Sequence, residues 1–490
     1  MAVLCKKLEV PSSFSMEGRL YRPRPLPDAA DRTGALAAAA QRDLELLAYP
    51  KEPFPYSRAP GILDAIIVGA GQAGLSIGFG LIRYGIRSIK LVDKRGKGFQ
   101  GPWRTYARNH VLRTRKDSTG NMEWGLTNLH FRTWAGAKYG PDYYESIEYI
   151  PISVWAEYLD WYAEATNLPI QYETCVNQIL WNSEEEYFEI DTNRSRFKAK
   201  FVVMAMGQES AGEHQCPPEV THALPTAAYA HTMDDIPAEK FAGRDIVIIG
   251  GGASAFDTAN FAMAAGARSV DMMIRRKMLP SKHIYCWGSR WLGFNRHYVD
   301  LPDKMKWAYS LADLENGVPP PRDTYFEAIS DARFRLFSSS PIDALLYRNG
   351  KIVGRYGGTE FEHDFMVCGT ANRTYIVHQP ELKTIIPHIK LWKDAYKPHD
   401  GKTHPSLEFS PYLGRAMQFQ PKEEQHSYVS RIFFLGSGGH GASRLSGYRC
   451  HLSGMQFTAP AICYEISKQV FLDHQEEIKT AFDAYDDWDE

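Results

Sequence analysis

Residues 64–93 read DAIIVGAGQAGLSIGFGLIRYGIRSIKLVD, and this stretch decides the fold. It opens with an apolar run, Ala65 to Val68, which is typical of a buried parallel strand. Three glycines in G-x-G-x-x-G spacing follow, then a helical segment and a second strand, Ser88 to Val92. Asp93 ends that strand, where its carboxylate can accept hydrogen bonds from a ribose. Together these features predict a dinucleotide-binding unit.

Each glycine of this fingerprint has its own physical task. Gly69 allows the tight turn after the strand, and Gly71 lets a pyrophosphate approach the backbone. Gly74 lets the helix pack closely on the strand. The helix begins near Gln72 and Ala73, so its N–H groups and the positive end of its dipole face the phosphates.

The pattern returns at residues 245–276, which read DIVIIGGGASAFDTANFAMAAGARSVDMMIRR. Its second strand ends in two arginines rather than in an acid. An acid would repel a ribose phosphate, whereas arginines can clamp it, so NADPH is expected here rather than NADH. The alternative is that both arginines simply end a strand in solvent. The positions expected to contact this nucleotide are Gly250, Gly252, Ser254, Ala255, Arg275 and Arg276.

Two dinucleotide sites in one chain predict a donor and an acceptor of hydride. One of them should be a flavin, because two nicotinamides would have little to exchange. We expect an α/β fold with two Rossmann-like domains, the NADPH domain inserted in a discontinuous FAD domain. The predicted segments are an N-terminal arm and linker at 1–60, FAD-binding parts at 61–215 and 366–475, an NADPH-binding domain at 216–365, and an acidic tail at 476–490.

Other segments interrupt the α/β alternation. Residues 280–350 crowd aromatic side chains and predict a mainly helical insertion, either a lid over an apolar substrate or a packed core of its own. The basic stretch after Asp93 carries Trp103, Tyr106 and Trp124, and it could cover a phosphate and stack on a planar ring. A solvated surface loop is the alternative. Residues 150–166 predict a helix with Ser153 as its cap.

Composition excludes several classes of function. The chain has 490 residues and a formal net charge of −2, so several domains are expected and nucleic acid is not an expected partner. No apolar stretch has the roughly eighteen residues of a membrane helix, and no secretory signal is recognised, so we expect a cytoplasmic protein without a membrane partner. The seven cysteines form no C-x-x-C pair and the sixteen histidines show no ligand spacing, so neither a redox dithiol nor a metal is expected.

The arrangement resembles the class B flavoprotein monooxygenases, which include dimethylaniline-type, Baeyer–Villiger and N-hydroxylating enzymes. The resemblance covers about residues 60–470 and rests first on the two fingerprints. GPWR at 101–104, MAMG at 204–207, VCGT at 367–370 and FLGSGGHGASRLS at 434–446 are similar to segments beside the flavin in that family. The cofactor contacts that it implies are Gly69, Gly71, Gln72, Ala73, Gly74, Asp93, Lys94, Trp103, Arg104, Val176, Gly207, His231, Gly369, Gly436 and Gly438.

The linker to the second fingerprint departs from the family pattern. It reads PTAAYAHT, in which His231 and Thr232 fit, but Pro225 and Ala227 replace an aromatic residue and a glycine. Asp235 stands where Baeyer–Villiger enzymes have a tryptophan. This difference disfavours the lactone-forming reaction.

The resemblance implies that NADPH reduces FAD, that reduced flavin captures molecular oxygen as a hydroperoxide, and that a small molecule is oxygenated, first of all at nitrogen or sulfur. The HGAS motif favours N-hydroxylation. Candidates to stabilise peroxide charge or to hydrogen-bond the flavin are Arg113, Lys116 and His440. The alternatives are a flavin reductase or oxidase that inserts no oxygen, Baeyer–Villiger chemistry, and a nucleotide-sensing flavoprotein. A homo-oligomer is compatible with the sequence.

Overall fold

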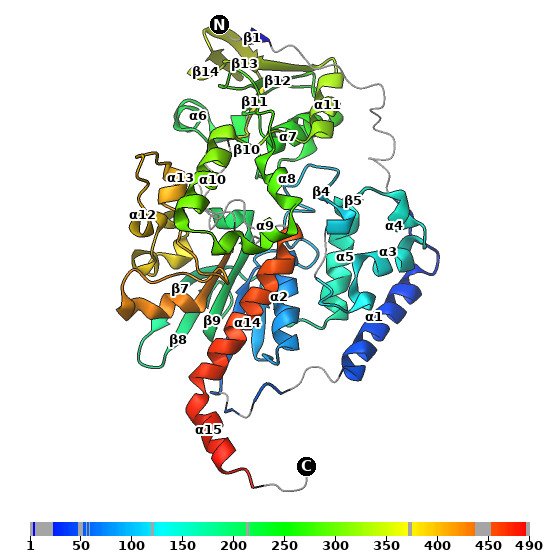
Figure 1. Ribbon diagram of the computed structural model, residues 1–490. Helices are drawn as coiled ribbons and strands as arrows, with labels where there is room; N and C mark the ends of the chain where they lie inside the picture. The colour runs from blue at the N-terminus through cyan, green and yellow to red at the C-terminus, as the bar shows by residue number, and fades with distance from the viewer. Residues whose placement is uncertain are drawn as a thin grey trace.

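The computed structural model describes residues 3–4, 23–47, 52–54, 56–57, 59–118, 122–211, 214, 216–370, 375–436 and 452–486. Within these residues the chain forms two main sheets, each with helices packed on it (Figure 1). Both are built around one of the two glycine fingerprints. The fold is therefore α/β with two Rossmann-like units, as the sequence predicted.

The first sheet has the strand order β6-β3-β2-β9-β8-β7, and β18 pairs with β9. Its strands are β2 (Ile62–Val68), β3 (Ile89–Val92), β6 (Ile170–Gln171), β7 (Val176–Asn182), β8 (Tyr187–Thr192), β9 (Arg196–Gly207) and β18 (Ile432–Gly436). The fingerprint strand β2 lies between β3 and β9, and all three run parallel. Because β18 comes from the C-terminal part of the chain, the first sheet is assembled from two distant segments.

The second sheet has the order β1-β13-β12-β11-β17-β10. Its strands are β1 (Val3–Leu4), β10 (Tyr229–His231), β11 (Asp245–Ile249), β12 (Ser269–Met273), β13 (Phe334–Ser338) and β17 (Phe365–Cys368). All pairs are parallel except β1 with β13. A separate antiparallel sheet follows β13, formed by β14 (Ile342–Arg348), β15 (Lys351–Tyr356) and β16 (Thr359–His363). The second sheet thus extends to Cys368, beyond residue 365, where the sequence placed the end of that domain.

The long helix α14 (Met455–Asp473) lies beside α2 (Gln72–Arg83), the helix of the first fingerprint (Figure 1). Gly80 makes this contact possible, because a Cβ there would collide with the Trp124 ring and would lie 2.8 Å from Cys463 Sγ. Trp124 is held by a hydrogen bond from its Nε1 to the Ser76 carbonyl at 2.9 Å. Trp124 therefore packs on α2 instead of offering its face to a ligand.

A second group of helices forms the edge of the molecule (Figure 1). The N-terminal helix α1 (Ala29–Leu46) contacts α3 (Phe131–Tyr139) and α5 (Ile152–Ala165). Helix α5 confirms the helix expected near residues 150–166. Its N-cap position is Pro151, however, and no side chain of the described residues caps it, so Ser153 as the cap was wrong. The arm is thus packed on the body through α1.

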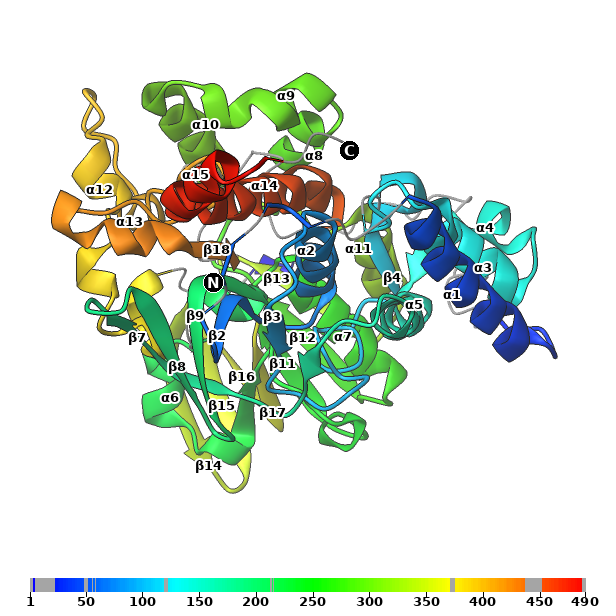
Figure 2. The same cartoon turned by 90° about the horizontal axis from the view of Figure 1, so that it is seen from below.

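The aromatic insertion is helical only in its first part. It contains α8 (Ile284–Ser289), α9 (Leu292–His297), α10 (Asp303–Asn316) and α11 (Arg322–Ser330), after which β13 and β14 follow. Helix α9 lies near the N-terminal end of α14 (Figure 1 and Figure 2), and Val299 packs against the cluster formed by Met417 and by Phe457 of α14. Trp307 is buried with Trp392 of α12 (Trp392–Ala395). Phe294, by contrast, contacts rings of the insertion itself, namely Trp287, Tyr298 and Tyr309. Several of the aromatic side chains therefore pack within the insertion, and Trp307 joins it to the C-terminal half of the chain.

Among the described residues, no helix combines the length and the apolar character needed to cross a membrane.

Candidate functional site

The carboxyl ends of the parallel strands in the first sheet meet at one edge, which is where such sheets bind ligands. Gly69 follows β2, Gly207 ends β9, and Gly436 ends β18 directly opposite Gly207. Gly69 has φ +106°, and a Cβ there would lie 2.6 Å from the Ala205 carbonyl oxygen. The structure thus brings together the strand-end glycines that the sequence selected from three separate motifs.

In the first glycine turn, Gly74 is packed against the backbone, whereas Gly71 faces open space. A Cβ at Gly74 would collide with the Gly69 carbonyl, so the helix and the strand need glycine there to touch. At Gly71 the nearest atom to an added Cβ is 3.8 Å away, in the backbone of Gly101. Gly71 is the N-cap of α2, and no side chain among the described residues caps this helix. Helix N–H groups and open space above them fit the pyrophosphate of a dinucleotide.

Asp93 shapes this turn. Its Oδ2 accepts a hydrogen bond from the Ala70 backbone N–H at 2.8 Å, and its Oδ1 accepts one from Arg95 N–H at 2.9 Å. Burial raises the pKa of the Asp93 carboxyl, although these backbone hydrogen bonds act in the opposite direction. Each oxygen keeps a further lone pair that a ribose hydroxyl could use. Asp93 therefore ties the end of β3 to the glycine turn.

The basic residues after Asp93 are paired with protein groups. Lys94 and Arg95 both contact Glu209, which follows β9, with Arg95 Nη2 2.6 Å from Glu209 Oε1. Arg104 lies 2.7 Å from Asp160 of α5, and Trp103 packs on the first hydrophobic core. Sequence reasoning missed Glu209; its place just after a strand end was the available signal. The ion pairs of Lys94 and Arg104 thus hold the loop after Asp93 against the first unit. Val176, another predicted cofactor contact, lies at the start of β7.

The second glycine turn repeats this arrangement, with Gly250 packed against backbone and Gly252 facing open space. A Cβ at Gly250 would meet Gly369, with the Gly369 carbonyl carbon 2.8 Å away. A Cβ at Gly369 would in turn lie 2.7 Å from the Ala255 Cβ. No described atom lies within 4 Å of a Cβ placed at Gly252, the N-cap of α7 (Ala253–Ala264). Ser254 lies in the first turn of α7, where its carbonyl accepts the Thr258 hydroxyl.

The two arginines after β12 have different environments. Arg276 Nη1 donates to the Asn316 carbonyl at 2.8 Å, and its guanidinium lies beside Gly317 at the end of α10. Arg275 is exposed and makes no hydrogen bond or ion pair with any described residue. Of the pair, Arg275 is therefore the one available to a ligand, while Arg276 fixes the insertion.

His231 lies at the end of β10, buried next to the second site. Its ring stacks on His214 with centroids 5.4 Å apart, and its backbone N–H donates to Asp234 Oδ2 at 2.7 Å. The ring Nδ1 accepts a hydrogen bond from Met233 N–H at 3.2 Å. These contacts give His231 a structural part in the linker between the two sheets.

A strap of residues 104–115 joins the two sheets. Arg108 donates to the Thr232 carbonyl at 2.7 Å and to the Asp234 carbonyl at 2.6 Å. Arg113 of β4 (Val111–Arg115) forms an ion pair with Asp257 of α7. Burial raises the pKa of Asp257, and the Arg113 charge opposes that rise. The sequence selected Arg113 but not Arg108 or Asp257, because their partners lie more than a hundred residues away.

The other two catalytic candidates are Lys116, which the structure describes, and His440, which lies outside the described residues. Lys116 Nζ donates to the Tyr144 carbonyl at 2.5 Å and lies 4.6 Å from the centroid of the Tyr144 ring. This ammonium is thus engaged by α4 (Tyr143–Ser146). His440 lies outside the described residues, as does Gly438.

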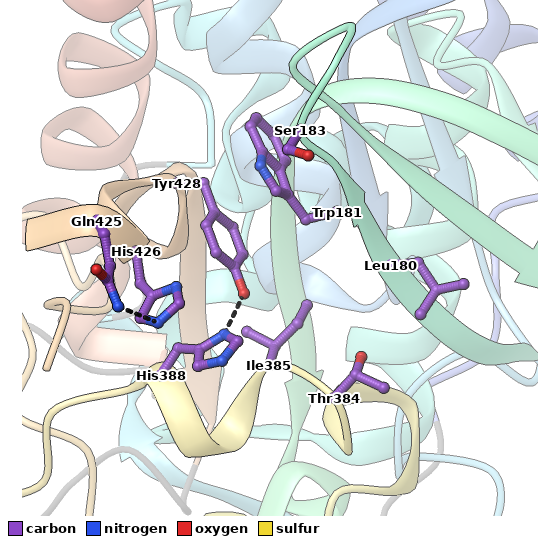
Figure 3. A pocket seen from close by; sticks show the side chains of 9 residues that line it. All are labelled: Leu180, Trp181, Ser183, Thr384, Ile385, His388, Gln425, His426 and Tyr428. Carbon is purple, nitrogen blue, oxygen red and sulfur yellow. Dashed lines mark hydrogen bonds between the residues drawn. The ribbon is translucent and has the colours of Figure 1, made fainter. Parts of the chain in front are cut away.

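A separate cavity of about 500 Å³ opens on the far strands of the first sheet (Figure 3). The His388 and His426 rings stack there with centroids 3.7 Å apart, and His388 Nδ1 is 2.6 Å from the Tyr428 hydroxyl. None of the residues predicted from the sequence lines it. Its full lining is Leu180, Trp181, Ser183, Thr384, Ile385, His388, Gln425, His426 and Tyr428. In the described part of the chain, no group of three or more His, Cys, Asp or Glu side chains could hold a metal.

Known proteins support the interpretation of the two turns. The family model for pyridine nucleotide-disulphide oxidoreductases matches residues 66–288, which include both fingerprints. An ornithine hydroxylase from Pseudomonas aeruginosa has a similar fold, with a TM-score of 0.64 at 14% identity over 84% of this chain and 100% of that one. An ornithine N-hydroxylase from Kutzneria sp. 744 gives a TM-score of 0.63 at 12% identity over the same shares.

A curated relative covers nearly the whole chain. The FAD-dependent urate hydroxylase of Xanthomonas campestris pv. campestris is 31% identical over 463 residues, which make up 92% of this chain and 96% of that protein. The chain therefore belongs to the family of that enzyme and is a class B flavoprotein monooxygenase, as its motifs indicated.

Proposed function

We propose that the chain binds FAD at the turn Gly69–Gly74 and NADPH at the turn Gly250–Ala255, and that it transfers one oxygen atom from O₂ to a small molecule. One observation carries this assignment. Both turns are packed at the outer fingerprint positions and open at the middle one. Among the described residues, Arg275 after the second strand has no partner, whereas Arg95 after the first strand is paired with Glu209. A guanidinium without a protein partner can pair with the ribose phosphate that distinguishes NADPH from FAD.

The residues present fit an FAD molecule at the first turn. Gly71 and the start of α2 would face its pyrophosphate, and Asp93 would face its ribose. The strand-end residues Gly207 and Gly436 leave the edge of the sheet without bulky side chains. Bound there, FAD supplies the electron transfer to oxygen that no amino-acid side chain provides.

The protein's own residues hold and orient the two nucleotides. Arg275 would bind the ribose phosphate, and Gly252 would admit the pyrophosphate against α7. Arg108 and Arg113 connect the loop beside the first turn to the second unit, so they fix the distance between donor and acceptor. Such positioning matters because hydride transfer needs the reacting atoms in close contact.

The substrate class follows from the relative that covers nearly the whole chain. A urate hydroxylase at 31% identity favours a planar, nitrogen-rich ring as the first substrate to test. Oxygenation of an amine nitrogen or of a sulfur is the second candidate, favoured by the HGAS motif. In either case NADPH, a proton, O₂ and the substrate give NADP⁺, water and the oxygenated product.

The test measures NADPH oxidation, O₂ uptake and peroxide release by the purified holoenzyme, with urate, with ornithine and without substrate. We expect urate to speed NADPH oxidation, to lower peroxide release, and to yield a product labelled from ¹⁸O₂. Coupling with ornithine alone would overturn the substrate class. Stoichiometric peroxide with every substrate would overturn oxygen insertion and favour the reductase or oxidase alternative.

A further inference from the structure

The two nucleotide units correspond position by position at the end of the second fingerprint strand, because the same backbone hydrogen bond joins strand and turn in each. The Gly69 N–H donates to the Val92 carbonyl at 2.7 Å, and the Gly250 N–H donates to the Met273 carbonyl at 3.0 Å. The residues that follow these carbonyls form three corresponding pairs: Asp93 and Ile274, Lys94 and Arg275, Arg95 and Arg276. Both units therefore carry two cations where a nucleotide ribose would lie.

The cations of the first unit are paired with one acid, Glu209. This residue follows β9, and β9 and β3 lie on opposite sides of β2. The Glu209 carboxylate contacts Lys94 Nζ and lies 2.6 Å from Arg95 Nη2. It thus reaches across the carboxyl end of β2, where the first glycine turn begins. Arg275, which corresponds to Lys94, makes no hydrogen bond or ion pair with any described residue.

Glu209 is largely buried, with 18% of its side chain exposed. Burial alone would raise the pKa of Glu209, but the hydrogen bonds and charges of Lys94 and Arg95 outweigh it and lower that pKa. The carboxylate is therefore ionised at neutral pH and offsets the positive charge beside it. A ribose phosphate would have to displace this carboxylate before it could pair with Lys94.

The sequence of the second unit has no acid at the position that corresponds to Glu209. A Cβ on the first fingerprint glycine would collide with the carbonyl group of Ala205 in the first unit and of Gly369 in the second, so these two residues correspond. Glu209 stands four residues after Ala205, whereas Arg373, which lies outside the described residues, stands four residues after Gly369. The charge at this position is thus reversed between the two units.

We propose that Glu209 is a specificity-determining residue: its pairing with Lys94 and Arg95 denies these cations to a ribose phosphate and keeps the first turn for FAD instead of NADPH. This inference rests on the proposed function, because it concerns which nucleotide the first turn accepts. Asp93 supplies the other part of the discrimination, since an acid beside the ribose repels a phosphate. Glu209 acts through Lys94 and Arg95 and needs no contact with the nucleotide.

The test measures how tightly the purified holoenzyme holds FAD, from the fluorescence of flavin released on dilution, with added NAD⁺ and with added NADP⁺. In the wild type we expect the same apparent Kd for FAD with both nucleotides. In Glu209→Gln, NADP⁺ should raise the apparent Kd for FAD about tenfold or more relative to NAD⁺, because a freed Lys94 can form a charge-assisted hydrogen bond with the ribose phosphate. Equal Kd values with NAD⁺ and NADP⁺ in this variant would overturn the proposal.

Two further variants separate this effect from damage to the loop. Glu164→Gln is the matched control, because Glu164 pairs at 2.7 Å with Lys97 of the same loop, and it should respond as the wild type does. Adding Lys94→Met to Glu209→Gln should abolish the response to NADP⁺, since it removes the freed cation. The same response in Glu164→Gln, or an unchanged response in the double variant, would overturn the proposal. If Glu209→Gln is purified without flavin, retention of FAD by the double variant would support the proposal and loss from both would overturn it.

The wild type separates this inference from the proposed function. A wild type that binds no FAD would overturn the proposed function and this inference with it. A wild type that binds FAD, together with a Glu209→Gln variant that does not respond to NADP⁺, would overturn the inference alone.

Discussion

Neighbouring residues of one type can have different tasks, as Arg275 and Arg276 illustrate. Arg276 is engaged by the Asn316 carbonyl, whereas Arg275 projects without a partner among the described residues. We predict that Arg275→Ala raises the KM for NADPH about tenfold or more, since a charge-assisted hydrogen bond contributes about 1.5–3 kcal/mol. The KM for NADH should hardly change, because NADH carries no ribose phosphate. Steady-state kinetics with both nucleotides measure this preference.

Arg276→Ala is the matched control. It removes the same charge one residue later, but it should disturb the end of α10 and leave the preference for NADPH over NADH intact. If both variants lose the preference equally, the phosphate is bound by the local positive charge and not by Arg275 in particular.

At the scale of elements, the packing of α14 on α2 depends on a glycine. A Cβ at Gly80 would collide with the Trp124 ring and would lie 2.8 Å from Cys463 Sγ. We predict that Gly80→Ala lowers the free energy of unfolding by about 1–3 kcal/mol, the usual cost of overpacking. The control is Gly34→Ala in α1, which has open space and should gain about 0.5–1 kcal/mol in helix propensity. Urea unfolding compares the two, and equal effects would contradict the packing argument.

A buried carboxylate, Asp271, supports the second sheet. Asp271 of β12 accepts two hydrogen bonds from Arg335, at 2.6 and 2.7 Å, and lies 3.0 Å from His363 Nε2. Burial alone would raise the pKa of Asp271, but the hydrogen bonds from His363 and Arg335 outweigh it and lower that pKa. Its folded-state pKa is below the unfolded value, so its contribution to stability is present at neutral pH and is lost as pH falls through the lowered pKa.

Asp271→Asn should therefore cost about 1.5–3 kcal/mol at pH 7, because it removes the buried charge that accepts hydrogen bonds from His363 and from the half-exposed guanidinium of Arg335. The difference from wild type should shrink as the pH falls below the ordinary carboxyl pKa of about 4 and on through the lowered pKa of Asp271, where the wild-type carboxylate also becomes protonated. Unfolding curves across this pH range measure it. Asp191→Asn is the control: Asp191 pairs with exposed Arg196 on a hairpin, where less than about 1 kcal/mol is expected. A pH-independent difference would assign the effect to packing.

Local patterns in the sequence predicted the strands and helices of both fingerprints, because glycine spacing and apolar runs are set by neighbouring residues. They did not predict that the insertion ends in strands β13 and β14. Strand β13 forms by pairing with the distant strand β12, whereas β14 forms a hairpin with the adjacent strand β15, a local pattern that was overlooked. The cap of α5 was also wrong, because Pro151 already directs the chain into the helix.

At the scale of the whole molecule, the contacts that matter most for function are those that fix the position of one nucleotide turn relative to the other. The side chains of Arg108 and Arg113 extend from the first unit and bind groups of the second. The sequence proposed a catalytic task for Arg113 because it is basic and follows the flavin loop. Its ion pair with Asp257 supports a different hypothesis, in which Arg113 positions the two units.

The two hypotheses for Arg113 predict different double-mutant cycles. If Arg113 acts through Asp257, then Arg113→Ala and Asp257→Asn should each slow anaerobic flavin reduction by NADPH, and the double variant should be no slower than either one, because both remove one interaction. Stopped-flow absorbance measures the rates. Arg115→Ala is the matched control, since exposed Arg115 pairs with Glu148 at 3.0 Å in its own unit, and its rate should not change. Additive losses, with the Arg113 variant impaired mainly in substrate oxygenation, would instead place the guanidinium at the reacting atoms.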